Sequence, residues 1–192
     1  MFTGPQGSGK TIGMVDYCLE LKKKYPKSKL YANFKIEGMD GQIKNLRDLL
    51  KIRNGEDGVI FCIDEIQNEF STASSRNFPE SLLATITQQR KQRIHIVASS
   101  QVFTRVAKPL REQCYCVVDC RTFFNRWTRL RAYPADEYNS IIDSNSLDKK
   151  RKIRRLWKMS FIQTDELRDK YDTYAVVARM SRNGFAETVT IR

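Results

Sequence analysis

Gly4-Pro5-Gln6-Gly7-Ser8-Gly9-Lys10-Thr11 is the stretch of sequence that decides the fold. It matches the pattern G-x-x-x-x-G-K-[ST] without a mismatch, and that pattern is typical of a phosphate-binding P-loop between a strand and a helix. Glycines let the backbone curl until successive N–H groups point at phosphate oxygens, and the following helix adds the positive end of its dipole. The whole stretch is therefore predicted to bind a nucleotide, with Lys10 on the β- and γ-phosphates and the Thr11 hydroxyl on Mg²⁺.

The residues on either side of this loop have the character that it requires. Met1-Phe2-Thr3 fits the end of a strand, although strands usually have about five residues. The sequence leaves open whether this strand is very short or whether the given chain starts later than the natural protein. After the loop, apolar residues recur at helical spacing over residues 11–24, and Pro26 ends that helix.

Strands and helices alternate over the first two thirds of the chain. Strands are expected at 30–36, 59–63, 94–99, 114–119 and 127–133, and helices at 42–52 and 79–92. The continuous apolar run at 59–63 is typical of a strand buried on both faces of a parallel sheet. This alternation predicts an α/β chain with the three-layer P-loop NTPase fold and a mainly parallel sheet.

The regular alternation of predicted strands and helices ends after residue 135. Residues 1–135 are predicted to form the ATPase core, and 136–192 a β-rich C-terminal extension packed on it. The extension is expected to contain a polar loop at 139–148, a strand at 156–163, a helix start at 164–170 and a hairpin. Asn183-Gly184 is the turn signal of that hairpin, between strands at 174–180 and 185–191.

A second motif supplies the acidic residues of a nucleotide site. Phe61-Cys62-Ile63-Asp64-Glu65 is an apolar strand that ends in two carboxylates, the Walker B pattern. Asp64 is predicted to hold Mg²⁺, and Glu65 to act as general base on the attacking water. Gln101, after the strand at 94–99, suits a sensor that touches the water and the γ-phosphate, because its amide both donates and accepts.

Hydrolysis also needs a positive charge on the transferred phosphoryl group, which a neighbouring subunit's arginine often supplies. Arg76 ranks first, because it lies in a polar loop shortly after the two carboxylates. The other candidates for this arginine finger are Arg90, Arg93, Arg105 and Arg111.

The charge balance indicates a polyanionic partner. The chain has 34 Lys and Arg against 22 Asp and Glu, a formal net charge of +12. Nucleic acid is the first expectation and an acidic membrane surface the second. DNA phosphates are predicted to contact the run Lys149, Lys150, Arg151, Lys152, Arg154 and Arg155. The alternative is a solvated helix face with Ile153, Leu156 and Trp157 turned inward.

Aromatic residues are interleaved with arginines over residues 121–131. Phe123, Phe124 and Trp127 could stack on bases, as in single-strand binding proteins. Because such aromatic residues more often belong to the core, burial is the preferred prediction.

The remaining composition narrows the class of protein. An odd count of 5 cysteines indicates reduced thiols in a cytosolic compartment. Cys114, Cys116 and Cys120 have zinc-like spacing, but no fourth ligand lies nearby and their alternation fits a strand. No run approaches the roughly 20 apolar residues of a membrane span, and no signal peptide is visible.

The order of these motifs resembles that of P-loop ATPases with an additional catalytic glutamate. Within this class, residues 63–70, 89–101 and 108–111 resemble the family of zonula occludens toxin and filamentous-phage assembly proteins. Tyr171-Asp172-Thr173 is similar to a motif that these proteins carry after the core. That family is related to the FtsK–HerA-type DNA translocases and to viral DNA-packaging ATPases. Its toxin and assembly members usually continue into a membrane span, which this sequence does not contain.

The resemblance implies an ATP-driven motor that packages viral or phage DNA. It implies ATP and Mg²⁺ as cofactors, double-stranded DNA as substrate, and hydrolysis between the subunits of a ring of five or six. A viral portal, vertex or membrane protein is the implied partner, and the host cytoplasm, a virion or the inner membrane the location. The alternatives are a membrane-associated phage assembly and extrusion ATPase, a small-molecule kinase and a non-catalytic nucleotide switch.

Overall fold

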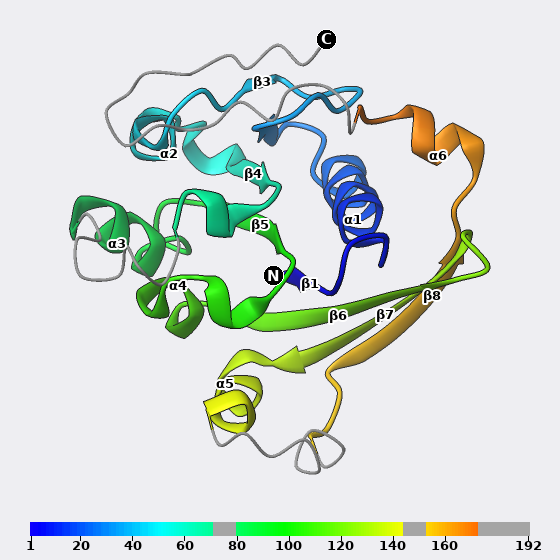
Figure 1. The fold of residues 1–192 in the computed structure, drawn as a ribbon. Helices are drawn as coiled ribbons and strands as arrows, with labels where there is room; N and C mark the ends of the chain where they lie inside the picture. The colour runs from blue at the N-terminus through cyan, green and yellow to red at the C-terminus, as the bar shows by residue number, and fades with distance from the viewer. Residues whose placement is uncertain (71–79, 144–152, 173–192) are drawn as a thin grey trace, which may run out of the picture.

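The computed structural model describes residues 1–70, 80–143 and 153–172, which form one sheet with helices on both faces (Figure 1). The strands of this sheet have the order β3-β2-β4-β5-β1-β6-β7-β8. They are β1 (Phe2–Thr3), β2 (Lys29–Ala32), β3 (Gly41–Gln42), β4 (Val59–Ile63), β5 (Ile94–Ser100), β6 (Cys116–Phe123), β7 (Trp127–Pro134) and β8 (Trp157–Ile162). The α-helices among the described residues are α1 (Lys10–Lys24), α2 (Leu46–Lys51), α3 (Glu80–Thr87), α4 (Lys108–Glu112), α5 (Ala135–Asp143) and α6 (Asp165–Asp169).

The sheet has a parallel and an antiparallel part. All neighbouring pairs from β3 across to β6 run parallel, whereas β7 and β8 are antiparallel to their neighbours. Helix α1 lies on one face, where Met14 and Val15 pack with Leu30 and Leu130. Helices α2, α3 and α4 lie on the other face of the parallel part (Figure 1). The predicted three-layer P-loop NTPase fold is therefore confirmed.

Strand β1 is very short, yet it lies in the middle of the sheet. Phe2 and Thr3 pair with β5 on one side and with β6 on the other. The Met1 amino group donates a hydrogen bond to the Cys116 carbonyl at 2.8 Å, and the Val118 N–H donates to the Met1 carbonyl at 2.7 Å. Two residues are enough because both neighbouring strands hold them.

The parallel strands largely follow the expected ranges. Every residue of β4 is buried, which explains its uninterrupted apolar run. Strand β2 stops at Ala32, short of the expected end at residue 36, because the Asn33 side chain turns to the backbone of Asp64.

The helices differ more from the expected ranges. Helix α2 begins only after Asn45, whose side chain accepts from the Arg47 N–H in a capping box, while residues 41–42 form β3. Helix α3 ends at Thr87, and turns lead on to Arg93, which has a positive φ of 54°. The expected helices at 42–52 and 79–92 are therefore too long.

Helix α5 corrects the expected polar loop at 139–148. Ala135 and Tyr138 are buried against Val117 and Tyr133 of the sheet, and Ile141 packs beside them. This spacing of three residues makes one helical face apolar although most residues of the segment are polar. The expected loop is helical up to Asp143, and its remainder lies outside the described residues.

The segment after α5 returns to the sheet. Strand β8 confirms the strand expected at 156–163 and pairs with β7 as the last strand. Thr164 caps α6, and the chain then passes α1 to reach Ile36, which bridges to Tyr171 (Figure 1). The hairpin expected at 174–191 lies outside the described residues.

Candidate nucleotide site

The predicted P-loop connects β1 to α1 and adopts backbone angles that only glycine tolerates well. Gly4, Gly7 and Gly9 have φ of 148°, 75° and 82°. A Cβ on Gly4 would lie 2.7 Å from the Cys120 carbonyl oxygen, so that position also has no room for a side chain. Gly9 is the N-cap of α1, which begins at Lys10. The glycines at these positions are required by the curl of the loop.

Two polar groups of the loop fit an anion. The Lys10 side chain is buried and its ammonium group donates to the Pro5 carbonyl at 3.1 Å. The Ser8 hydroxyl is buried and has no hydrogen-bond partner among the described residues. A buried hydroxyl without a partner is costly in a folded protein. A phosphate oxygen would satisfy this hydroxyl, so the loop fits the nucleotide phosphates.

The carboxylate of Asp64 lies against the start of α1. It accepts hydrogen bonds from the Thr11 hydroxyl, with a shorter distance of 3.2 Å, and from the Ser99 hydroxyl. Burial raises the pKa of Asp64 above its ordinary value, while the bonds from Ser99 and Thr11 act in the opposite direction. A hydroxyl beside a carboxylate in a half-buried site suits Mg²⁺, a hard cation that prefers oxygen ligands.

Two further polar residues position this carboxylate, and sequence analysis missed both. Asn33, at the end of β2, donates to the Asp64 carbonyl at 3.0 Å and accepts from the Asp64 N–H at 2.8 Å. Ser99, on β5, accepts from the Glu65 N–H at 3.0 Å. Both lie at the carboxyl ends of strands that flank β4. Because ligands of parallel sheets bind at the carboxyl ends of the strands, the polar residues toward the ends of the strands expected at 30–36 and 94–99 could have been considered as site residues.

Glu65 follows Asp64 in a left-handed conformation, with φ of 52°. The Gln101 amide donates to one of its carboxylate oxygens at 3.4 Å, and the Gln67 amide donates to the other. The structure therefore brings together the predicted base and the predicted sensor, and it adds Gln67. Strained backbone at a bulky polar residue is frequent at functional sites.

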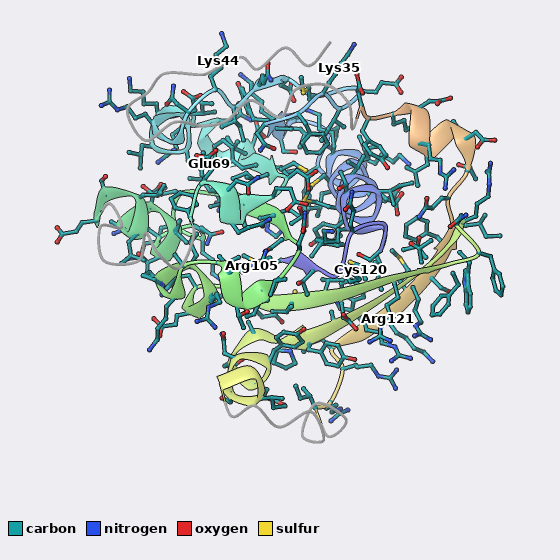
Figure 2. The ribbon with its side chains drawn as sticks, in the orientation of Figure 1. Lys35, Lys44, Glu69, Arg105, Cys120 and Arg121 are labelled. Atoms are coloured by element: carbon teal, nitrogen blue, oxygen red, sulfur yellow. The ribbon has the colours of Figure 1, made fainter. Side chains whose placement is uncertain are left out.

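A cavity of about 640 Å³ opens beside the P-loop, on the side of β6. Figure 2 labels Cys120, which lines the cavity, and Arg105, which directly follows the lining segment 101–104. The cavity is lined by residues 3–8 of the loop, by 101–104 after β5, by 119–123 of β6 and by Tyr138. It has room for the part of a nucleotide that extends beyond the phosphates.

The candidates for the arginine finger differ in their burial and in their position relative to the P-loop. Arg111 is buried, and its guanidinium donates to the Val106 carbonyl and to the Asn139 side chain, both at 3.1 Å. It therefore braces α4 against α5 and is a poor candidate for a finger. Arg90 and Arg93 lie before β5, at the sheet edge opposite the P-loop. Arg105 is exposed and directly follows Thr104, the last residue of the cavity lining in that segment. Arg76, ranked first from sequence, lies outside the described residues.

The predicted DNA-contact run is only partly described. Lys149, Lys150, Arg151 and Lys152 lie outside the described residues, whereas Arg154 and Arg155 are exposed and lead into β8. Ile153 is buried, but Leu156 and Trp157 are 44% and 37% exposed. The alternative prediction, in which Ile153, Leu156 and Trp157 all turn inward from a solvated face, is therefore right for Ile153 only.

The preferred core position of the aromatic residues at 121–131 is wrong, because Phe123 is only half-buried and the other two are exposed. Phe124 is 94% exposed and Trp127 is 42% exposed. Phe124 directly follows β6 and Trp127 is the first residue of β7, so both lie where these strands meet, at the end of the sheet away from α5 (Figure 1).

The cysteines carry no metal site in the part of the chain that the structure describes. All five cysteines are free, and within 1–70, 80–143 and 153–172 no group of three or more His, Cys, Asp or Glu is placed to hold a metal ion. Among the helices described, none is long and apolar enough to cross a membrane.

Comparison with solved structures shows the same fold in two proteins. The N-terminal domain of zonular occludens toxin from Neisseria meningitidis superposes with a TM-score of 0.57 at 19% identity, over 89% of this chain and 96% of that chain. The genome packaging NTPase B204 from Sulfolobus turreted icosahedral virus 2, in complex with ATP-gammaS, superposes with a TM-score of 0.52 at 11% identity, over 70% and 90%. No curated protein sequence matches significantly.

The family comparison covers the elements that form the site. The model of the ATPase family associated with various cellular activities (AAA) matches residues 1–121, which include the P-loop, β4 with its two carboxylates, and β5 with Gln101. The matched region is more than half of the chain. This chain is therefore an ATPase and belongs to the AAA family.

Proposed function

We propose that this ATPase is a DNA translocase that packages a viral or phage genome. The observation that carries the hydrolytic part of this proposal is the Asp64-Glu65 pair, with one carboxylate bonded to Thr11 of the P-loop helix and the other to Gln101. This arrangement divides two adjacent carboxylates between a cation and a water molecule, as ATP hydrolysis needs.

The roles of the residues follow from their places. The backbone N–H groups of the loop from Gly4 to Thr11, which Pro5 alone lacks, and the Lys10 ammonium bind the phosphates. Thr11 and Asp64 would hold Mg²⁺, which would neutralise charge on the phosphates. Glu65 accepts the proton of the water that attacks the γ-phosphate, and Gln101 orients that water. Arg105, exposed near the cavity, is the finger that one subunit offers to the site of the next.

DNA as the substrate is supported by charge and by fold. The net charge of +12 suits a polyanion. B204, which shares the fold, is named for genome packaging. A ring of five or six subunits in the host cytoplasm, docked to a viral portal, vertex or membrane protein, completes the proposal.

The test is ATP hydrolysis by the purified protein with and without DNA, over a series of salt concentrations. Stimulation by DNA that fades as salt rises is expected, because phosphate contacts release counterions. Hydrolysis that is indifferent to DNA at every salt concentration would overturn the translocase proposal.

A second candidate is a membrane-associated phage assembly and extrusion ATPase. The observation that favours it is the fold shared with the zonular occludens toxin domain over 89% of this chain. In that case, anionic vesicles or a coat protein should stimulate hydrolysis, and DNA should not.

A further inference from the structure

One surface of the molecule lies on the antiparallel strands, meets the candidate nucleotide cavity only at its β6 edge, and carries an unusual set of side chains. Side chains alternate along the antiparallel strands: Cys120 and Leu130 point to α1 and are buried, so their neighbours in sequence point away from α1. Arg121 of β6, for example, lies on the far side of the sheet from α1 (Figure 2). We call this surface the outer face; it consists of Asp119, Arg121, Phe123, Trp127, Arg129, Arg131, Lys158, Ser160 and Ile162.

The outer face places positive charges directly opposite one another. Arg121 on β6 is the cross-strand partner of Arg129 on β7, and Arg131 on β7 is the partner of Lys158 on β8. Like charges in such positions destabilise a sheet. The one carboxylate on these three strands is Asp119, which lies directly opposite Arg131 on β7 and 3.7 Å from the Arg121 guanidinium. Its side chain is only 16% exposed, so four cations share a single carboxylate. The arrangement favours an anion that bridges the strands.

Aromatic rings continue the outer face to the β6–β7 turn. Phe123 and Trp127 lie with ring centroids 5.4 Å apart, and the Arg129 guanidinium lies 5.0 Å above the Phe123 ring. Phe124 projects from the turn with 94% exposure, and its φ is 50°. A bulky residue in the left-handed region and in water is unfavourable on both counts. Folding does not account for a phenylalanine at this position.

The turn is also held in place from the α1 side. Arg126 forms an ion pair with Asp165 at 2.8 Å, and Arg168 donates to the Asn125 carbonyl at 2.5 Å. Arg168 also binds Gln163, whose amide donates to the Thr128 hydroxyl at 2.7 Å. These bonds hold the turn that carries Phe124 and Trp127, as in a preformed binding surface.

We propose that the outer face binds a single strand of nucleic acid. Its phosphates lie across Arg121, Arg129, Arg131 and Lys158, and its bases stack on Trp127 and Phe124. The inference rests on the proposed function, in which DNA is the substrate, and it replaces the double-stranded substrate expected from sequence with a single strand. The reason is that a duplex keeps its base faces covered, whereas exposed rings beside arginines stack on unpaired bases.

An anionic membrane is the competing occupant, and the geometry favours it less. The charges extend along the strands to Lys158, away from the exposed Phe124 ring. Arg154 and Arg155, the described part of the predicted DNA-contact run, precede β8 and add charge at that far end. The phosphates of a nucleic-acid strand can contact this whole row of positive side chains. Insertion of the Phe124 ring into lipid would leave most of those side chains without a contact.

The test compares DNA binding by matched variants, with a fluorescein-labelled oligothymidylate and a labelled duplex of equal length. Arg129→Gln/Lys158→Gln removes two charges from the outer face. Lys35→Gln/Lys44→Gln removes two exposed charges from the opposite side of the molecule (Figure 2). The outer-face variant should weaken binding of the single strand and lower the slope of log affinity against log salt by about 0.7 per lost contact. The control should bind nearly as the wild type does.

Phe124→Asn tests stacking without a risk to folding, because asparagine tolerates positive φ better than phenylalanine. Its melting temperature should equal or exceed that of the wild type, while the oligothymidylate binds about tenfold more weakly. Three results would each overturn the inference. The first is an equal loss of single-strand binding in the control variant, and the second is a preference for the duplex that Phe124→Asn leaves unchanged. The third is an outer-face variant that binds both DNAs normally but binds phosphatidylserine vesicles more weakly than the wild type. Wild-type protein that binds neither DNA would instead overturn the proposed function.

Discussion

At the scale of single residues, Asp64 and Glu65 show how environment divides the work of two adjacent carboxylates. Asp64 is largely buried, with hydroxyls of Thr11 and Ser99 on its oxygens, and burial raises its pKa. Glu65 turns away through a left-handed backbone and receives two amides. Hydroxyls beside the first carboxylate suit the proposed cation site, and amides on the second suit its proposed action on the attacking water.

Glu65→Gln should bind ATP with nearly unchanged affinity but hydrolyse it at least about 100-fold more slowly, because the amide cannot accept a proton. Single-turnover hydrolysis and equilibrium binding of a fluorescent ATP analogue measure the two effects. Glu56→Gln, at an exposed glutamate near the opposite sheet edge, is the matched control. Turnover at the wild-type rate in the Glu65 variant would remove Glu65 as the general base.

The pKa of Asp64 leads to a prediction about stability. A carboxylate whose pKa is raised in the folded protein destabilises the fold progressively as pH rises above its ordinary value of 3.8. Asp64→Asn should therefore raise the melting temperature at neutral pH, and this gain should shrink when the pH falls toward 3.8. Mg²⁺ with ATP should stabilise the wild type more than the variant. A variant less stable than the wild type at neutral pH would contradict this assignment.

At the scale of elements, the strands could be predicted best and the chain between them least. The uninterrupted apolar run at 59–63 was enough to predict that β4 is buried, and the P-loop motif was enough to predict that α1 follows it. Helix α5 was missed because its apolar face consists of few residues among polar ones. Phe124 was assigned to the core because an apolar side chain is usually buried, and sequence carries no sign that a turn exposes it. Asn33 acts through a neighbouring strand, which only the sheet order reveals.

The contact between α1 and the antiparallel strands gives a prediction at this scale. A Cβ on Gly9 would lie 2.6 Å from the Thr122 hydroxyl, whereas a Cβ on Gly7 would meet nothing within 4 Å. Both residues have positive φ. Gly7→Ala should cost about 1–2 kcal/mol of unfolding free energy through backbone strain alone, and Gly9→Ala should cost clearly more. Urea denaturation measures both, and equal losses would show that β6 and β7 do not constrain the loop.

At the scale of the whole molecule, the sheet separates two tasks. The parallel strands carry the nucleotide residues at their carboxyl edge, and the antiparallel strands carry the outer face. Strand β6 belongs to both, because Arg121 and Phe123 border the cavity and also lie on the outer face. A ligand on the outer face therefore lies within one strand of the nucleotide, which is the shortest route by which DNA could change the rate of hydrolysis.

The exposed Arg105 leads to a prediction about assembly, since a finger acts in the site of a neighbouring subunit. Arg105→Ala and Glu65→Gln should each be nearly inactive alone, with an effect of about 1000-fold for the arginine. Mixed subunits of the two variants should recover activity, because some interfaces then pair an intact Arg105 with an intact Glu65. Arg47→Ala, at an exposed arginine on α2, should be active alone. The measurement is the rate of ATP hydrolysis over a series of mixing ratios of the two variants. If the rate does not recover at any ratio, Arg105 does not act in the site of a neighbouring subunit.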